Sequence, residues 1–198
     1  DYYHVTWVNG TANHDIINLS NDSLLSAPII AQMNAGKQGA WVDGGAGDDT
    51  VTGTGFADAF RNGAGNSKID GGANVAPEGR WGKDVFEISV ENQAALDAVQ
   101  VVASDDANYT WMVTYGASGQ KDYLKDIEAV SIQVAGGGAG KWIALALEVN
   151  EISGSNVAGS MHFAWAQGTE RADTFDAAVD VSAATQALMA EHGRGVWV

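Results

Sequence analysis

The chain has 198 residues, a formal net charge of −15 and no cysteine. This acidity argues against nucleic acids and anionic membrane surfaces as partners, and the lack of cysteine excludes disulfides and thiol chemistry. Hydrophobic residues make up 45% of the chain, enough for a core, but no apolar run is long enough to cross a membrane. We therefore expect a folded protein with no nucleic-acid partner and no membrane insertion.

The first forty residues alternate strand and turn patterns. Residues 2–8 are rich in aromatic and β-branched side chains and predict a strand, and Gly10–Asn18 is a degenerate nine-residue block. Within 21–36 we expect a loop and a short helix that Ser26 caps and Gly36 ends.

The most regular stretch begins at Asp43. Gly44–Thr52 reads GGAGDDTVT and fits the nonapeptide G-G-x-G-x-D-x-U-x at every fixed position, U being a large apolar residue. Gly53–Arg61 and Asn62–Asp70 keep the phase, and residues 74–81 interrupt a fourth block. An ordinary glycine-rich surface loop does not hold such a phase, so we expect stacked turns joined by short strands.

This spacing predicts bound calcium. Glycine readily takes positive φ, which lets carbonyls converge, and Ca²⁺ takes about six to eight oxygen ligands. We expect several Ca²⁺ ions. The predicted ligands are the block glycines and aspartates with neighbouring acids: Asp43, Gly45, Gly47, Asp48, Asp49, Asp58, Gly63, Gly65, Asp70 and Asp84. Solvated acids at turns are the alternative reading of these aspartates.

Two turns depart from the pattern, since Phe56 replaces a glycine and Ser67 an aspartate. These turns either bind Ca²⁺ incompletely or complete its shell with an oxygen from a ligand or from water.

Strand patterns follow residue 84. The predicted strands are Val85–Val90, Tyr109–Tyr115, the end of 122–134, Lys141–Val149 and Ser160–Ala166, and Asn92 caps a short helix over Asn92–Gln100. Residues 85–166 are expected to form a β-sandwich-like body. The predicted fold class is mainly β: that body, a calcium-binding glycine-rich coil at 43–87, and a few short helices, within a single domain over 1–198.

The end of the chain repeats its beginning, because residues 165–198 parallel residues 7–42. Both contain a Gly-Thr pair, then an aspartate four residues after the threonine (Asp15 and Asp173), a helix with a methionine, and a Trp-Val pair. In the first copy the calcium blocks follow at Asp43. We therefore expect the sequence to be part of a longer multidomain chain.

These blocks resemble the calcium-binding repeats of the RTX family. The specific motif covers 43–87, with weaker matches at 10–18 and 168–176, so the resemblance touches under half of the chain. Within the family, the chain is most similar to the peptide-binding domain in the ligand-binding region of large bacterial RTX adhesins. The resemblance implies a secreted or bacterial cell-surface module that needs Ca²⁺ and recognises peptide or protein C-termini on a target cell.

Candidate ligand-binding residues come from the interruption and from one aromatic strand: Ser67, Asn74, Arg80, Trp81, Tyr109 and Trp111. A guanidinium pairs with a carboxylate, and an indole offers a flat apolar wall. The interruption fits an ordinary surface excursion equally well. The aromatic stripe, which repeats every second residue, is more often core than binding site.

Three other functions fit the sequence. A calcium-dependent carbohydrate-binding module would expose tryptophan and tyrosine, a passive calcium-rigidified extender would have no pocket, and an RTX segment of a secreted enzyme would have catalytic motifs upstream. The chain has no serine-hydrolase, zinc-protease or phosphate-loop motif, and its 4 histidines lack metal-ligand spacing. We therefore do not expect an enzyme.

Overall fold

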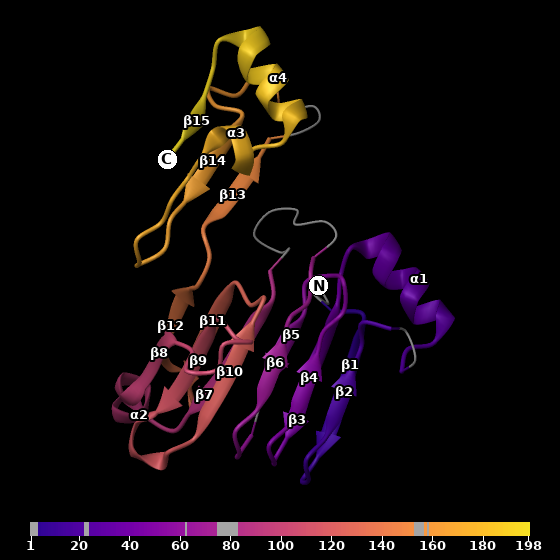
Figure 1. Ribbon diagram of the computed structural model, residues 1–198, viewed down its shortest axis with the longest axis vertical. Coiled ribbons are helices and arrows are strands. Elements are labelled where there is room, and N and C mark those ends of the chain that lie inside the picture. The colour runs from indigo at the N-terminus through magenta and orange to yellow at the C-terminus, as the bar shows by residue number, and fades with distance from the viewer. Residues whose placement is uncertain (1–3, 22–23, 62, 75–82, 153–156, 158) are drawn as a thin grey trace. The chain divides into compact units, whose positions relative to one another are not determined.

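The structure is a computed structural model that describes residues 4–21, 24–61, 63–74, 83–152, 157 and 159–198 (Figure 1). These residues fall into two compact units, one ending at Ile143 and one beginning at Ala144. The expectation of a single domain over 1–198 stays a prediction. The fold class is mainly β with few helices, as the sequence predicted.

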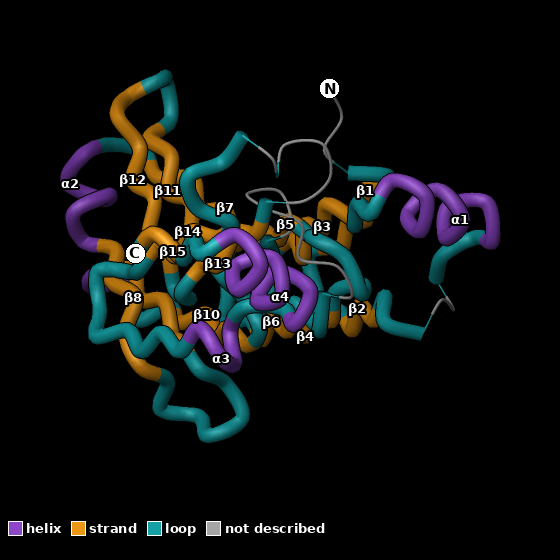
Figure 2. Tube along the Cα trace, turned by 90° about the horizontal axis from the view of Figure 1, so that it is seen from above, coloured by secondary structure: helices purple, strands orange, loops and turns teal. Residues whose placement is uncertain are grey.

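Two six-stranded sheets form the first unit, and they appear as two rows of strands in Figure 2. The first sheet has the order β1 (Thr6–Thr11), β3 (Ala40–Gly45), β5 (Ala59–Arg61), β7 (Val85–Val90), β11 (Ala129–Val134) and β12 (Gly138–Ala144). The second has the order β2 (Ile16–Asn18), β4 (Thr50–Thr52), β6 (Lys68–Asp70), β10 (Lys121–Lys125), β9 (Trp111–Tyr115) and β8 (Val99–Ala103).

The strands of consecutive nine-residue blocks alternate between these two sheets. From β3 to β7 the chain passes from one sheet to the other at every strand, so that Val51 of one block pairs with Ile69 two blocks later. All neighbours from β1 to β11 are parallel, as are those from β2 to β10. Only β9 and β8 extend the second sheet in antiparallel fashion.

The large apolar residue of each block builds the core between the sheets. In register across the first sheet lie Val42, Phe60, Phe86 and Val130, and across the second lie Ile17, Val51, Ile69 and Leu124. None of these eight is more than 6% exposed. Each contributes about 1.5–3 kcal/mol by burial, which makes the spacing of apolar residues the main determinant of strand register.

The first unit also contains short helices. Helix α1 (Ala27–Gly36) has Pro28 in its first turn and ends before Lys37, whose φ is 53°. Helix α2 (Gln93–Ala98) follows Asn92, whose side chain accepts a 3.0 Å hydrogen bond from the Ala95 amide. A 3-10 turn, η2, covers Gly116–Ser118.

The predicted body over 85–166 differs from the structure. Strands β7, β10 and β11 continue the two sheets of the coil, and residues after 144 belong to the second unit. The single strand predicted at Lys141–Val149 is wrong, since it divides into β12 and β13 (Glu148–Glu151), which lie in different sheets. Alternating apolar residues predict which face of a strand is buried, but they do not predict which sheet the strand joins.

The second unit contains a sheet of β13, β14 (Ala164–Gln167) and β15 (Val196–Trp197), with helices α3 (Ala177–Asp180) and α4 (Ala183–His192). Strands β14 and β15 are parallel and align Trp165 with Trp197. In the first unit, β1 and β3 are parallel and align Trp7 with Trp41. A ten-residue helix lies between the paired strands in both segments.

Candidate metal centre

The nine-residue blocks place their turns in two rows at opposite ends of the strands. One row contains residues 12–15, 46–49 and 63–67, which follow β1, β3 and β5 at the lower edge of the first unit in Figure 1. The other row contains residues 53–58, 71–74, 83–84 and 126–128. Each row aligns one acidic or hydroxyl side chain from each block. The aligned side chains of the first row are called the first column, and those of the second row the second column.

In the first row, each side chain accepts a hydrogen bond from the backbone of the preceding coil. Asp49 Oδ1 accepts from the Asp15 amide at 2.9 Å, Ser67 Oγ from the Asp49 amide at 3.0 Å, and Asp122 Oδ1 from the Ser67 amide at 3.0 Å. Asp49, Ser67 and Asp122 are at most 1% exposed. Ser67 therefore accepts the same backbone hydrogen bond that an aspartate accepts at this position of the other blocks.

Asp49 retains one unsatisfied oxygen. Its Oδ2 is buried and has no hydrogen-bond partner among the residues that the structure describes. Burial raises the pKa of this carboxyl, and the nearby Asp15 carboxylate adds to the shift against the opposing hydrogen bond from the Asp15 amide. A buried oxygen without a partner is costly, so the site favours either a proton or a cation at this atom.

The second row repeats the arrangement with three acids. Asp58 Oδ1 accepts from the Ala40 amide at 2.5 Å, Asp84 Oδ1 from the Asp58 amide at 2.7 Å, and Glu128 Oε2 from the Asp84 amide at 2.6 Å. Burial raises the pKa of Asp58 to about 7. Burial and the neighbouring Asp58 carboxylate raise the pKa of Asp84 to about 10, and burial raises that of Glu128.

Glycines allow the turns to stack at close range. Gly45, Gly47 and Gly65 have φ values of 86°, 125° and 129°, which disfavour other residues. A Cβ atom at Gly45 would overlap the Thr11 carbonyl oxygen, and one at Gly65 would overlap the Gly47 carbonyl oxygen. A Cβ atom at Gly63 would also overlap the Gly45 carbonyl oxygen, to which the Gly63 amide donates at 2.8 Å. Carbonyl oxygens of one turn therefore face the next.

The remaining predicted ligands have structural partners. Asp43 and Asp70 each accept from the amide two residues on, that of Gly45 at 3.0 Å and that of Gly72 at 3.1 Å. Asp70 also pairs with Lys125, with 2.7 Å between Oδ2 and Nζ. Asp48 Oδ1 accepts from the Asn66 amide at 2.8 Å.

Calcium fits the oxygen chemistry of these rows, because carboxylates and carbonyls are its preferred ligands. Across the described ranges, no three acidic or histidine side chains converge in a way that would hold a metal ion by themselves. A calcium shell would therefore need backbone carbonyls beside one or two carboxylates. The carbonyl oxygens of Thr11, Gly45 and Gly47, which face the glycines of the first row, are oxygens of this type, although each already accepts a hydrogen bond.

Two acids in these columns were missed by the sequence analysis. Asp122 and Glu128 occupy the block position of Asp49, yet they lie beyond the glycine-rich segment. The signal that identifies them is an acid two residues before a buried apolar residue, Leu124 or Val130, as in Asp49-Thr50-Val51.

The predicted ligand-binding residues do not form one group. Arg80 and Trp81 lie outside the described residues. Asn74 Nδ2 donates to Asp84 Oδ2 at 3.1 Å, and Ser67 is buried in the first column. The Tyr109 ring contacts the Lys68 ammonium, with 5.5 Å from Nζ to the ring centroid.

The aromatic strand β9 connects to the first column. Trp111 on this strand is partly exposed. Tyr115, the last residue of this strand, donates its hydroxyl to Asp122 Oδ2 at 2.5 Å. Burial and the Asp122 carboxylate raise the pKa of this tyrosine. Tyr115 thus fixes the second oxygen of Asp122, whereas Asp49 has no equivalent partner.

Comparison with known proteins gives no family assignment: no protein-family model matches the chain, and no curated protein matches it significantly. Among the described residues, no helix is long and apolar enough to cross a membrane.

Proposed function

We propose that the chain is a Ca²⁺-dependent ligand-binding module of a large secreted adhesin of the RTX type. The observation that carries this proposal is the first column of buried side chains, in which Asp49 Oδ2 lacks a partner beside stacked glycine turns. The parallel two-sheet coil with its nine-residue phase also supports the RTX resemblance.

Asp49 and Asp48, with carbonyls of Gly45, Gly47, Gly63 and Gly65, would hold one ion, and Asp58 with Asp84 would contribute to a second. Bound Ca²⁺ would neutralise carboxylates that otherwise keep a proton or repel one another. The chain's own residues then do the remaining work: the amides of one coil fix the carboxylates of the next, and the glycines keep the turns in contact. Metal binding would therefore be coupled to folding.

The ligand proposed first is the C-terminus of a peptide or protein on a target cell, reached outside the cell, where Ca²⁺ is plentiful. A carboxylate-bearing ligand suits an incompletely coordinated ion or the Arg80 guanidinium. Because the net charge of −15 repels an anionic ligand, a positively charged or metal-bridged contact would favour its binding.

Thermal unfolding of the purified chain in Ca²⁺, in Mg²⁺ and in EDTA tests the metal half of the proposal. A site that binds only the folded state stabilises it by about 2.7 kcal/mol at one hundred times Kd, so we expect a clear rise in Tm with Ca²⁺ alone. Asp49→Asn should reduce this rise. Asp173→Asn, an exposed acid in the second unit, is the matched control and should leave it unchanged. A melt that chelation does not alter would refute calcium dependence.

A peptide panel with free or amidated C-termini, screened in Ca²⁺ and in EDTA, tests the ligand half. Binding that needs both Ca²⁺ and a free carboxylate supports recognition of C-termini. No peptide binding, with a Tm that Ca²⁺ still raises, would contradict ligand recognition and leave a rigid extender.

A further inference from the structure

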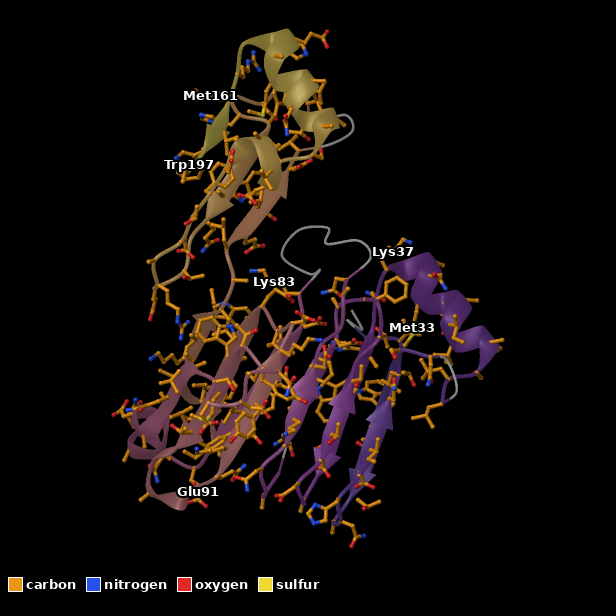
Figure 3. All side chains as sticks on the ribbon, viewed as in Figure 1. Met33, Lys37, Lys83, Glu91, Met161 and Trp197 are labelled. Atoms are coloured by element: carbon orange, nitrogen blue, oxygen red, sulfur yellow. The ribbon has the colours of Figure 1, made fainter. Side chains whose placement is uncertain are left out.

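Each unit of the chain displays a pair of tryptophans on neighbouring parallel strands. Trp7 of β1 aligns with Trp41 of β3, and Trp165 of β14 aligns with Trp197 of β15. Residues in register on neighbouring strands, about 4.8 Å apart, present their side chains on the same face. Trp7, Trp165 and Trp197 are 59%, 38% and 67% exposed, whereas Trp41 is only partly exposed, and Trp197 is labelled in Figure 3. Neighbouring indoles that remain open to solvent offer apolar faces to a ligand.

In the first unit, the indole of Trp41 lies along the surface of the sheet. Trp41 Nε1 donates to Glu87 Oε2 at 3.2 Å, although β5 lies between the strands that carry these two residues. The indole therefore crosses over β5. The residue of β5 in register with Trp41 is Ala59, whose small side chain is only 3% exposed. A ring held in this way presents a flat face, with its edge fixed by Glu87.

A row of hydrogen-bonding side chains runs beside each tryptophan pair. Two residues along the strands of the first unit come Asn9, Asp43, Arg61 and Glu87, aligned across four neighbouring strands. In the second unit Gln167 follows Trp165 by two residues and aligns with Glu148 of β13. Both pairs thus combine indole faces with amide and carboxylate groups on the same side of a sheet.

We propose that the two tryptophan pairs are binding platforms for neutral oligosaccharides. A pyranose ring offers an apolar C–H face that stacks on an indole, while its hydroxyl groups hydrogen-bond to amides and carboxylates. The carboxylates of both rows and the net charge of −15 oppose anionic saccharides and peptide carboxylates at these faces. The same charge opposes pairing of this face with a second copy of the chain.

This proposal goes beyond the calcium-dependent site, because none of the four tryptophans belongs to the stacked turns. The experiments distinguish failure of the calcium proposal from failure of the platform proposal. A Tm that does not depend on Ca²⁺ would refute the metal site but would not affect the tryptophan platforms. Loss of sugar binding in a tryptophan variant with an unchanged Ca²⁺-dependent Tm would identify the platforms alone.

The test uses the full chain in Ca²⁺ with maltoheptaose, cellohexaose, laminarihexaose and chitohexaose as neutral probes. Sialyllactose and alginate oligosaccharide are the anionic probes. Isothermal titration measures affinity, and tryptophan fluorescence reports contact with indoles. We expect at least one neutral probe to bind and the anionic probes not to bind. Trp7→Ala and Trp197→Ala should each weaken or abolish binding at their own platform, with a loss of about tenfold for one ring-stacking contact.

Trp142 provides the matched control, since it is 54% exposed on β12 but outside both pairs. Trp142→Ala should leave affinity unchanged, and an equal loss in this variant would overturn the proposal. Failure of all four neutral probes to bind would overturn it as well. Self-association of the chain that Trp7→Ala abolishes, without sugar binding, would assign the face to a second copy instead. Each variant is checked by its unfolding curve, and Trp7→Leu, Trp142→Leu or Trp197→Leu replaces an alanine variant that does not fold.

Discussion

Segments 7–42 and 165–198 form the same local turn in different surroundings. In the first, Asp15 Oδ2 accepts from the Thr11 amide at 2.7 Å, and in the second, Asp173 Oδ2 accepts from the Thr169 amide at 2.7 Å. In the first segment, Val42 is 1% exposed and lies in register with Phe60 of a following coil, whereas Asp173 of the second segment lies in an exposed turn. The Gly-Thr turn therefore needs only its own residues, but the buried column of acids needs neighbouring coils.

The pH dependence of stability should have opposite signs in the two units. In EDTA, Asp58 holds its proton in the fold up to a pKa of about 7, against an ordinary pKa of 3.8, so its contribution to stability is complete below about pH 4 and is lost as the pH rises through 7. The shift corresponds to about 4 kcal/mol. Asp84 extends the loss toward pH 10. Excess Ca²⁺ should flatten this slope by replacing the protons.

In the second unit, desolvation raises the pKa of Glu151, but hydrogen bonds from Ser182 and Thr185 outweigh it and lower the pKa overall. The contribution of Glu151 is present above its ordinary pKa of 4.5 and is lost as the pH falls below it. Thermal unfolding from pH 3 to 9 in EDTA measures both slopes. Parallel slopes in the two transitions would contradict this contrast.

Removing the aspartate from the same turn should have unequal effects. Asp58→Ala leaves the buried amides of Ala40 and Thr54 without acceptors and should cost about 3 kcal/mol. Asp173→Ala, in an exposed turn, should cost about 0.5 kcal/mol. Urea unfolding at pH 6 in EDTA, followed by circular dichroism, gives both values. Equal losses would show that the column adds nothing to the local turn.

Gly39 and Gly195 occupy matching positions before β3 and β15. A Cβ atom at Gly39 would overlap the Asp58 carboxylate and the Ala57 carbonyl oxygen, whereas nothing lies within 4 Å of one at Gly195. We expect Gly39→Ala to destabilise the first unit by about 2 kcal/mol through overpacking, and Gly195→Ala to be close to neutral. Hydrogen exchange of the amides in each unit separates the two effects. A neutral Gly39→Ala would mean that the coils are not in contact there.

The smallest expected difference concerns the helix caps, and here the second unit should lose more stability than the first. Ser182 caps α4 by accepting from the Thr185 amide at 3.3 Å and donates to Glu151 Oε2 at 2.5 Å, whereas Ser26 makes no side-chain cap bond to α1. Ser182→Ala should therefore cost about 1 kcal/mol and Ser26→Ala a few tenths. Chemical denaturation measures both, and a larger loss for Ser26→Ala would contradict the assigned caps.

The sequence predicted the repetitive part of the fold well, because its signals are local. The spacing of Val51, Phe60 and Ile69 set the strand period, and Asn92 marked the start of α2. The candidate site was predicted in part: Asp49, Asp58 and Asp84 lie in the columns, but Asp122 and Glu128 join from beyond the glycine-rich segment. Their membership depends on which strands become neighbours.

The sequence alone determined the composition of each block: glycines where φ is positive, an acid, and an apolar residue two positions later. Those choices follow from backbone sterics and burial, which act over a few residues. The tertiary structure alone decided that β7, β10 and β11 extend the same two sheets and that residues after 144 separate into a second unit. It also decided which acids are buried and which stay exposed, because desolvation depends on the coils that stack above and below each turn.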